Sequence, residues 1–385
     1  MKRVTVLGCG RVGTTLARNL AADPALDVNV VDADQRNLDE LSSLGVQTRR
    51  MDLGSAKAIA SAVENCDVAV GALPSMLGFR ALETVIACGK SYCDISFMAE
   101  DGLQLDAIAR ERGVTAVIDC GVAPGLANMM IGRCHADLDH TEDVVLYVGG
   151  LPKVRRWPYE YAAPFSPADV VEEYTRPARL IEHGRIVVKP ALSDAEQIDF
   201  PGVGTLEACN TDGLRSLIRT IDAVHMREKT LRYPGHFELM RVLRETGFFL
   251  KDAIDVGGQA VRPIDVTSRL LFPKWRRPDS ESEFTVLRVV VAGRKGDASL
   301  RYRFDLYDET DARTGQTSMA RTTAFPAAIV ARMIASGTFA EPGVHPPETL
   351  GRNRRIFDQV IAELAQRGVV VRQDVAGVPP SRSGV

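Results

Sequence analysis

A glycine-rich turn near the N-terminus limits the possible folds more than any other feature. The run Val4–Leu7 is apolar and rich in β-branched residues, which is typical of a buried parallel strand. Gly8, Gly10 and Gly13 interrupt it, and helical spacing of apolar residues begins again at Leu16. Glycine at these positions permits a tight turn, close approach of a ligand to the backbone, and close packing of helix on strand. The pattern predicts a strand–turn–helix unit that binds a phosphate group at the helix N-terminus.

A carboxylate at the end of the next strand extends this pattern. The run Val28–Val31 is followed by Asp32, 19 residues after Gly13, where such folds place the acid that binds the adenosine ribose. The sequence therefore predicts a dinucleotide site, with an ordinary strand–turn–helix as the alternative. Asp32 and Asp34 would repel a 2′-phosphate, which favours NAD over NADP, whereas Arg36 would weaken that preference. The predicted cofactor-binding residues are Gly8, Gly10, Arg11, Val12, Gly13, Asp32, Asp52, Leu73, Pro74 and Ser75.

The order of strands and helices predicts the fold class. Strand and helix patterns alternate six times between residues 4 and 119, as in a doubly wound parallel sheet. Helical spacing returns at Thr323–Ser336 and Arg352–Arg367. We therefore predict an α/β protein with a discontinuous NAD-binding Rossmann domain made of residues 1–120 and about 315–373.

Residues 121–314 have a different, strand-rich pattern. The runs that predict strands are Val144–Val148, Ile186–Lys189, Phe284–Ala292 and Leu300–Asp308. We expect a second, α+β domain built on a mixed sheet, which binds substrate and forms a dimer interface. Its last strand carries Tyr302 and Tyr307 among charged residues, so this face is expected to be covered by another subunit in a homodimer or higher homo-oligomer. His225 is expected on a helix surface, and the tail 374–385 is expected to be disordered.

Composition excludes several classes of partner. The 47 basic and 50 acidic residues of the 385-residue chain are interspersed, so there is no electrostatic basis for binding nucleic acid or an anionic membrane. The seven cysteines include no CxxC pair, which favours a reducing compartment and a cytoplasmic location. Cys88 and Cys93 have no clustered histidine, so no metal site is predicted.

Ligands of doubly wound sheets bind beyond the carboxyl ends of the strands. Asp94, at such an end, is a candidate catalytic residue, with capping of a helix as the alternative. Asn128 is placed to contact substrate or to pack, and His236 is either a base or a helix-cap residue. Arg215 and Arg232 are candidates for binding a substrate carboxylate, with ion pairs as the alternative.

Several motifs together resemble one family along nearly the whole chain. These motifs are Gly8–Gly13, Asp94–Phe97, Gly121–Asn128, Gly149–Pro152, Glu173–Arg179, Asp212–Ser216 and Leu231–His236. They resemble the saccharopine dehydrogenase-like family, and within it most closely the lysine 6-dehydrogenases. The resemblance implies NAD-dependent oxidative deamination of L-lysine at its 6-amino group. It also implies that Phe97, Asp212 and Tyr233 contribute to substrate binding.

Three departures from the family pattern favour lysine as the substrate. Saccharopine-forming relatives tend to carry an aspartate where this chain has Ala123, an Asp-His pair where it has Ala127-Asn128, and a tyrosine where it has Phe97. A saccharopine or carboxynorspermidine dehydrogenase is the alternative within the same class. A non-catalytic, NAD-sensing regulatory protein is the alternative from another class.

Overall fold

The computed structural model describes residues 1–278 and 280–377. The chain divides into two compact units. The first, unit 1, comprises Met1–Ala136 and Ala320–Val371, and unit 2 comprises Asp137–Met319 and the chain from Arg372. Residues 121–136, which were predicted to belong to the second domain, lie in unit 1.

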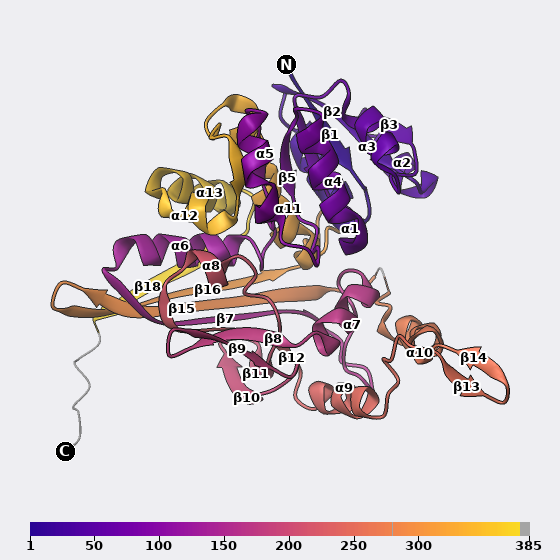
Figure 1. The fold of residues 1–385 in the computed structure, drawn as a ribbon, viewed down its shortest axis with the longest axis vertical. Helices are drawn as coiled ribbons and strands as arrows, with labels where there is room; N and C mark the ends of the chain where they lie inside the picture. The colour runs from indigo at the N-terminus through magenta and orange to yellow at the C-terminus, as the bar shows by residue number, and fades with distance from the viewer. Residues whose placement is uncertain (279, 378–385) are drawn as a thin grey trace. The chain divides into compact units, whose positions relative to one another are not determined.

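Unit 1 is built on a parallel sheet of seven described strands in the order β17-β6-β5-β4-β1-β2-β3 (Figure 1). The strands are β1 (Lys2–Leu7), β2 (Leu26–Asp32), β3 (Gln47–Arg50), β4 (Val68–Gly71), β5 (Ser91–Asp94), β6 (Thr115–Val117) and β17 (Gly343–His345). Every ladder between neighbours is parallel. The predicted α/β, Rossmann-like parallel sheet is therefore confirmed, and β17 is an additional strand that was not predicted.

Helices alternate with these strands along the chain. They are α1 (Arg11–Ala21), α2 (Gln35–Ser42), α3 (Ala56–Val63), α4 (Ser75–Ala87), η1 (Gly102–Leu105), α5 (Asp106–Glu111), α6 (Leu126–Asp137), α11 (Ser318–Ser336), α12 (Pro347–Arg352) and α13 (Arg354–Gln366). Polar side chains fix several of their starts, because a cap accepts a hydrogen bond from an otherwise unpaired N–H group. Asp34 caps α2, Ser55 caps α3 and Asn353 caps α13.

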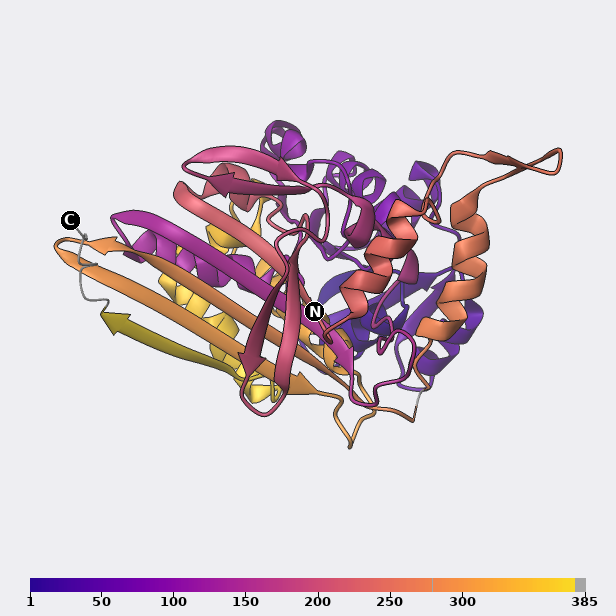
Figure 2. The ribbon, with the colours of Figure 1, turned by 90° about the horizontal axis from the view of Figure 1, so that it is seen from below.

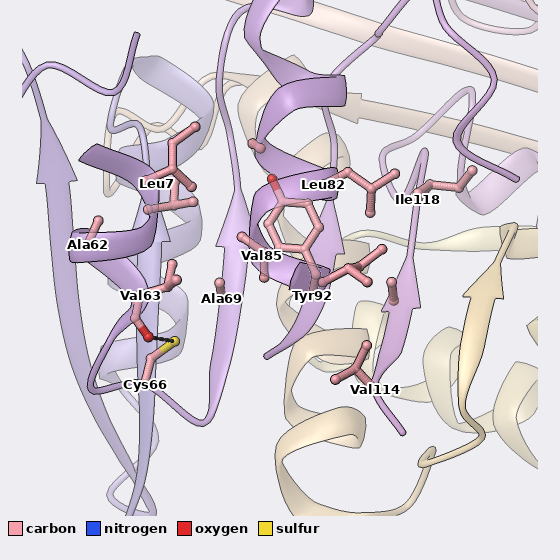
Figure 3. Close-up of a cluster of buried hydrophobic side chains, with 14 of the residues drawn as sticks. Leu7, Ala62, Val63, Cys66, Ala69, Leu82, Val85, Tyr92, Val114 and Ile118 are labelled. Atoms are coloured by element: carbon pink, nitrogen blue, oxygen red, sulfur yellow. Dashed lines mark hydrogen bonds between the residues drawn. The ribbon is translucent and has the colours of Figure 1, made fainter. Parts of the chain in front are cut away.

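The core of unit 1 fills one side of the sheet with aliphatic side chains. Figure 3 shows Leu82 and Val85 of α4 close to Tyr92 of β5, whose ring is fully buried. The four residues of β4 are all buried, which explains why its sequence is continuously apolar rather than alternating.

Unit 2 is built on a mixed sheet of nine described strands (Figure 2). They are β7 (His140–Pro152), β8 (Ala178–Glu182), β9 (Arg185–Lys189), β10 (Glu196–Phe200), β11 (Gly204–Asn210), β12 (Ala223–Arg232), β15 (Glu283–Lys295), β16 (Ala298–Glu309) and β18 (Val371–Gly377). The main order is β10-β11-β12-β7-β15-β16-β18. Strand β12 is parallel to β7 and antiparallel to β11, so the predicted mixed sheet is confirmed.

Four helices of unit 2 pack around a separate core rich in aromatic residues. They are α7 (Pro167–Thr175), α9 (His236–Glu245), α10 (Pro263–Leu271) and η2 (Phe272–Trp275), whereas α8 (Leu217–Thr220) contributes no residue to it. Trp275 is fully buried and packs with Tyr161, Tyr174 and Phe237. A hairpin of β13 (Ile254–Val256) and β14 (Gln259–Val261) extends away from α9 and α10 (Figure 2).

Three local predictions need correction. His225 lies in strand β12 and not on a helix. Tyr302 is buried, with its hydroxyl bonded to the carboxylate of Asp137, so it adds nothing to an exposed face, whereas Tyr307 is 43% exposed. The homodimer stays a prediction. Asp374–Gly377 belong to β18 rather than to a disordered tail, and residues 378–385 lie outside the described residues.

The contact between α6 and α12 leads to a stability prediction. A Cβ atom on Gly132 would lie 2.1 Å from the carbonyl oxygen of Glu348, which forces backbone to move. Gly132→Ala is expected to lower the free energy of unfolding by about 1–3 kcal/mol, as overpacking does, measured by urea unfolding. Gly377→Ala is the control, because a Cβ there meets no atom within 4 Å. Equal stabilities of the two variants would contradict the close packing.

Candidate active site

The turn between β1 and α1 approaches other backbone more closely than a side chain would allow. Gly8 has φ of +90°, and a Cβ on it would lie 2.6 Å from the carbonyl oxygen of Ala72. A Cβ on Gly13 would lie 2.2 Å from the carbonyl oxygen of Gly8. A Cβ on Gly10 would meet nothing within 4 Å, so open space lies over the middle of the turn. Gly8 and Gly13 therefore hold the turn, and Gly10 leaves room for a ligand.

The N-terminus of α1 suits a phosphate group. No side chain caps it, and its first turn contains no acidic residue. The N–H groups of Arg11 and Val12 are thus available to an anion, which the helix dipole also favours. Together with the space over Gly10, these groups fit the pyrophosphate of a dinucleotide.

Asp32 lies at the end of β2, where the ribose is expected. Its Oδ2 accepts a hydrogen bond from the backbone N–H of Cys9 at 2.6 Å, and its Oδ1 accepts one from that of Asp34 at 2.7 Å. The half-buried carboxylate keeps lone pairs for further donors. Asp34 caps α2 and pairs with the exposed Arg36, which lowers the pKa of Asp34.

The other predicted cofactor residues lie at neighbouring strand ends. Strand β1 pairs with both β2 and β4, so the strand order reverses there, which is where such sheets bind ligands. Leu73 and Pro74 follow β4, and Ser75 begins α4. Asp52 follows β3 and is exposed, and it accepts a hydrogen bond from the N–H of Gly54, which makes a local turn.

Asp94 is fully buried at the end of β5. Its Oδ1 accepts hydrogen bonds from the hydroxyls of Tyr92 and Ser96, and its Oδ2 accepts one from the N–H of Ser96. Burial raises the pKa of Asp94 to about 7, against these hydrogen bonds, which lower it. With no exposed surface and three donors, Asp94 is positioned to hold the turn after β5.

Asn128 holds the turn before α6. It is fully buried; its Oδ1 accepts from the N–H of Gly125 at 3.1 Å, and its Nδ2 donates to Glu348 at 3.2 Å. These contacts correspond to the packing role. The side chains of Ala123 and Phe97, near the ends of β6 and β5, are instead half-buried.

In unit 2, the guanidinium of the predicted residue Arg232 is enclosed by protein groups. Its Nε donates to the hydroxyl of Tyr174 at 2.7 Å, and its two terminal nitrogens donate to the carbonyl of Leu231 and to Glu173. The group also lies 4.5 Å from the ring centre of Tyr161. Arg232 is 3% exposed, so its role in this structure is a buried ion pair, the alternative considered for it.

His236, the first residue of α9, continues this network. Its Nδ1 lies 2.9 Å from the carbonyl oxygen of Tyr159, and because a carbonyl only accepts, Nδ1 carries the proton. Its Nε2 then accepts from the hydroxyl of Tyr174 at 3.0 Å. Burial and the charge of Arg232 lower the pKa of His236 to about 3. The ring is therefore neutral, with both nitrogens occupied inside unit 2.

The remaining predicted substrate residues have different surroundings. Asp212 forms a two-point ion pair with Arg179, with distances of 2.8 and 2.9 Å. Tyr233 packs in another apolar cluster and donates its hydroxyl to the carbonyl of Pro152. Arg215 is half-buried and has φ of +55°, in the left-handed region that non-glycine residues seldom adopt.

Glu228 of β12 is a buried acid that was not predicted. Its Oε2 accepts hydrogen bonds from the hydroxyl of Thr211 at 2.6 Å and the N–H of Gly213 at 3.1 Å. Burial, together with the charges of Glu173 and Asp212, raises the pKa of Glu228 to about 8, against the hydrogen bonds from Thr211 and Gly213, which lower it. The run from Met226 to Arg232 has no apolar alternation, so no local pattern in the sequence could have revealed this acid.

The described residues contain no group of three or more His, Cys, Asp or Glu side chains that could hold a metal ion. None of the helices described in the structure is long and apolar enough to cross a membrane.

The raised pKa of Glu228 predicts a pH-dependent stability. The folded state keeps the proton of Glu228 up to about pH 8, whereas the unfolded chain releases it near pH 4.5. The group therefore costs stability as pH rises through this range. Glu228→Gln should match the wild type below pH 4.5 and become more stable than it by pH 8, by on the order of 2–4 kcal/mol.

Urea unfolding at several pH values measures this difference. Glu196→Gln is the control, because Glu196 lies on the same sheet with its side chain 44% exposed. A difference between Glu228→Gln and wild type that does not change with pH would show that Glu228 ionises normally in the fold.

Comparison with known proteins identifies the family. The model of the saccharopine dehydrogenase NADP binding domain matches residues 4–117, and that of the saccharopine dehydrogenase C-terminal domain matches residues 121–369. The chain is 22% identical to saccharopine dehydrogenase [NADP(+), L-glutamate-forming] of Pyricularia oryzae, over 97% of this chain and 99% of that protein. It is 21% identical to carboxyaminopropylagmatine dehydrogenase of Synechocystis, over 99% of both chains.

Two further similarities concern length and fold. The chain is 22% identical to the mitochondrial alpha-aminoadipic semialdehyde synthase of Mus musculus over 96% of its own length, but spans 47% of that protein. Apo saccharopine dehydrogenase (L-Glu forming) from Saccharomyces cerevisiae has the same fold, with a TM-score of 0.80 at 17% identity over 98% of this chain and 100% of that one. Since the two family models together match nearly all of the chain, it belongs to the saccharopine dehydrogenase family and is an NAD(P)-dependent dehydrogenase.

Proposed function

We propose that this protein oxidises the 6-amino group of L-lysine with NAD. The products are 2-aminoadipate 6-semialdehyde, which can cyclise to piperideine-6-carboxylate, and ammonia and NADH. The ammonium loses a proton, the 6-carbon loses a hydride to the cofactor, and water hydrolyses the resulting imine. In sum, lysine, NAD⁺ and water give semialdehyde, ammonium, NADH and a proton.

The observation that carries the choice of lysine is the apolar character of two half-buried residues at strand ends. Phe97 follows β5 and Ala123 follows β6, where saccharopine-forming relatives tend to carry tyrosine and aspartate. Lysine presents four methylenes, which favour apolar neighbours, whereas saccharopine carries an additional dicarboxylate that needs polar partners.

The chain's own residues supply binding and orientation. The turn over Gly10 and the N-terminus of α1 hold the pyrophosphate, and Asp32 accepts hydrogen bonds from the ribose. The bound nicotinamide supplies the hydride acceptor. Arg215 stays a candidate for the substrate carboxylate, and Arg232 is a poor one, because each nitrogen of Arg232 already has a protein acceptor.

The reacting amine must be deprotonated before a hydride leaves. A lysine side chain has a pKa of about 10.4, and an ammonium has no lone pair to assist the departure of the hydride. Desolvation or a base must therefore remove a proton. His236 is a poor base in this structure, since Nε2 already accepts a hydrogen bond from Tyr174.

A saccharopine dehydrogenase is the second candidate. The similar proteins from P. oryzae and S. cerevisiae favour it, because both are named saccharopine dehydrogenases and match this chain over nearly its full length. In that reaction the oxidised nitrogen is a secondary amine.

An absorbance assay separates the two candidates. We expect NADH at 340 nm from L-lysine and NAD without another substrate, and a much lower rate with saccharopine. Saccharopine turnover without NADH from lysine would overturn the proposed reaction. Tight binding of NAD without turnover of either amine would support the sensing protein instead.

The preference for NAD rests on the charge of Asp32. Asp32→Asn should lower kcat/KM for NAD about 10- to 150-fold, because hydrogen bonds to a charged acceptor contribute about 1.5–3 kcal/mol. Activity with NADP should fall less, since repulsion of the 2′-phosphate is removed. Asp67→Asn is the control, because Asp67 accepts a hydrogen bond from the N–H of Arg3 at the amino ends of β1 and β4, opposite the ends that carry the cofactor turn. An unchanged NAD/NADP ratio would assign the role to another acid, such as Asp34.

A further inference from the structure

Among three acids of unit 2, two act electrostatically on the third, Glu228. They are Glu173 of α7, Asp212 of the loop after β11, and Glu228 of β12. Asp212 is paired with Arg179, and Glu173 is paired with Arg232. Glu228 has no ion-pair partner among the described residues, although it is 3% exposed. A buried charge without a partner is costly, so the position of Glu228 calls for either a proton or a cation.

The two oxygens of Glu228 have different surroundings. Both of its hydrogen bonds, from Thr211 and Gly213, end on Oε2. Oε1 has no hydrogen-bond partner in the described part of the chain. It is not completely enclosed by protein either. Packing holds the group in place, because a Cβ on Gly213 would lie 2.5 Å from its Cδ. The carboxyl is thus oriented by one oxygen and open at the other.

Another polar atom of unit 2 lacks a hydrogen-bond partner but differs in its surroundings. The hydroxyl of Tyr161 has no partner within the described residues, but it is enclosed, and Tyr161 is 4% exposed with its ring under Arg232. Oε1 of Glu228 is not enclosed in this way. An ammonium group carries three N–H donors and one positive charge, and a carboxylate oxygen can accept one of these donors.

We propose that Glu228 binds a primary ammonium group of the substrate through Oε1, while Thr211 and Gly213 hold Oε2. The inference rests on the proposed amine substrate, and it assigns to Glu228 the recognition of that substrate's positive charge. Because the free carboxyl is largely protonated at pH 7, binding of a cation displaces its proton. The groups that act on Glu228 are the hydroxyl of Thr211, the N–H of Gly213 and the two acids, Glu173 and Asp212.

Calorimetry of L-lysine binding in the presence of saturating NADH, which prevents turnover, tests the proposal. The binding enthalpies at pH 7 in phosphate and in Tris differ in proportion to the number of protons released, because the two buffers have different ionisation enthalpies. The wild type should release about one proton more than Glu228→Gln, as expected for a group with a pKa one unit above the pH. Glu228→Gln should bind L-lysine about 10- to 100-fold more weakly and NADH normally, since a charged acceptor is lost. Glu196→Gln, on the opposite face of the sheet, should behave as wild type.

Two analogues identify which ammonium is bound. If Glu228 holds the α-ammonium, its substitution should not affect binding of 6-aminohexanoate, which lacks that group. If it holds the 6-ammonium, binding of L-norleucine should be unaffected. Wild-type affinity of Glu228→Gln for L-lysine, with equal proton release, would overturn the proposal.

The same titration with saccharopine tests the role of Glu228 independently of whether lysine is the substrate. Failure of NADH formation from lysine, with saccharopine binding weakened in Glu228→Gln, would refute the lysine reaction and support the role of Glu228. A wild-type protein that binds neither compound would refute the role of Glu228 as well.

Discussion

The close approach of backbone to backbone at the β1–α1 turn determines the geometry of unit 1. The carbonyl of Ala72 occupies the space where a Cβ of Gly8 would be, and the carbonyl of Gly8 does the same at Gly13. The N–H of Gly8 bonds the carbonyl of Val31, and the N–H of Ala72 bonds that of Leu7. The ends of β1, β2 and β4 are therefore tied together by main chain alone. The N–H groups of α1 point into the resulting crevice whatever side chains surround it, so the anion site follows directly from the fold.

Unit 2 depends on a different constraint, which is the pairing of buried charge. Arg232 reaches three acceptors and two aromatic faces, and its hydrogen bond to Tyr174 continues through His236 to the carbonyl of Tyr159. Every donor in this chain of bonds has an acceptor, which makes it a rigid support between β12, α7 and α9. Glu228, in contrast, has no cationic partner among the described residues, whereas the nearby acids Glu173 and Asp212 each pair with an arginine.

The parts that could be predicted from sequence are those set by local constraints. The spacing of Gly8, Gly10 and Gly13, the apolar run of β4 and the cap at Asp34 are each visible within a few residues of sequence, so the parallel sheet and the cofactor turn were predictable. The network around Arg232 was not, because Tyr174 lies 58 residues earlier in the chain. Arg232 and His236 were identified separately, and only their meeting at one hydroxyl shows that both are internal.

The strand that holds Glu228 was hidden for a physical reason. One face of β12 carries His225, Arg227 and Lys229, and of these Arg227 pairs with Asp143 and Lys229 with Glu196. The other face carries Met226, Glu228 and Thr230, so both faces contain polar residues and the apolar alternation of an ordinary strand is absent. Its pairing with β7, about 80 residues earlier in the chain, is what makes it a strand.

The hydrogen bonds of three carboxylates indicate three different roles. Asp94 accepts from three donors through both oxygens and has no exposed surface, so its capacity is used within the protein. Asp32 accepts one N–H on each oxygen but remains half-buried, which leaves lone pairs for ribose hydroxyls. Glu228 uses one oxygen and keeps the other open in a buried setting, where an unmet charge is most costly. An ionised carboxylate offers about four lone-pair sites. The number of unfilled sites, together with burial, therefore distinguishes the three acids. Asp94 is structural, Asp32 can accept further neutral donors, and Glu228 can accept a cation.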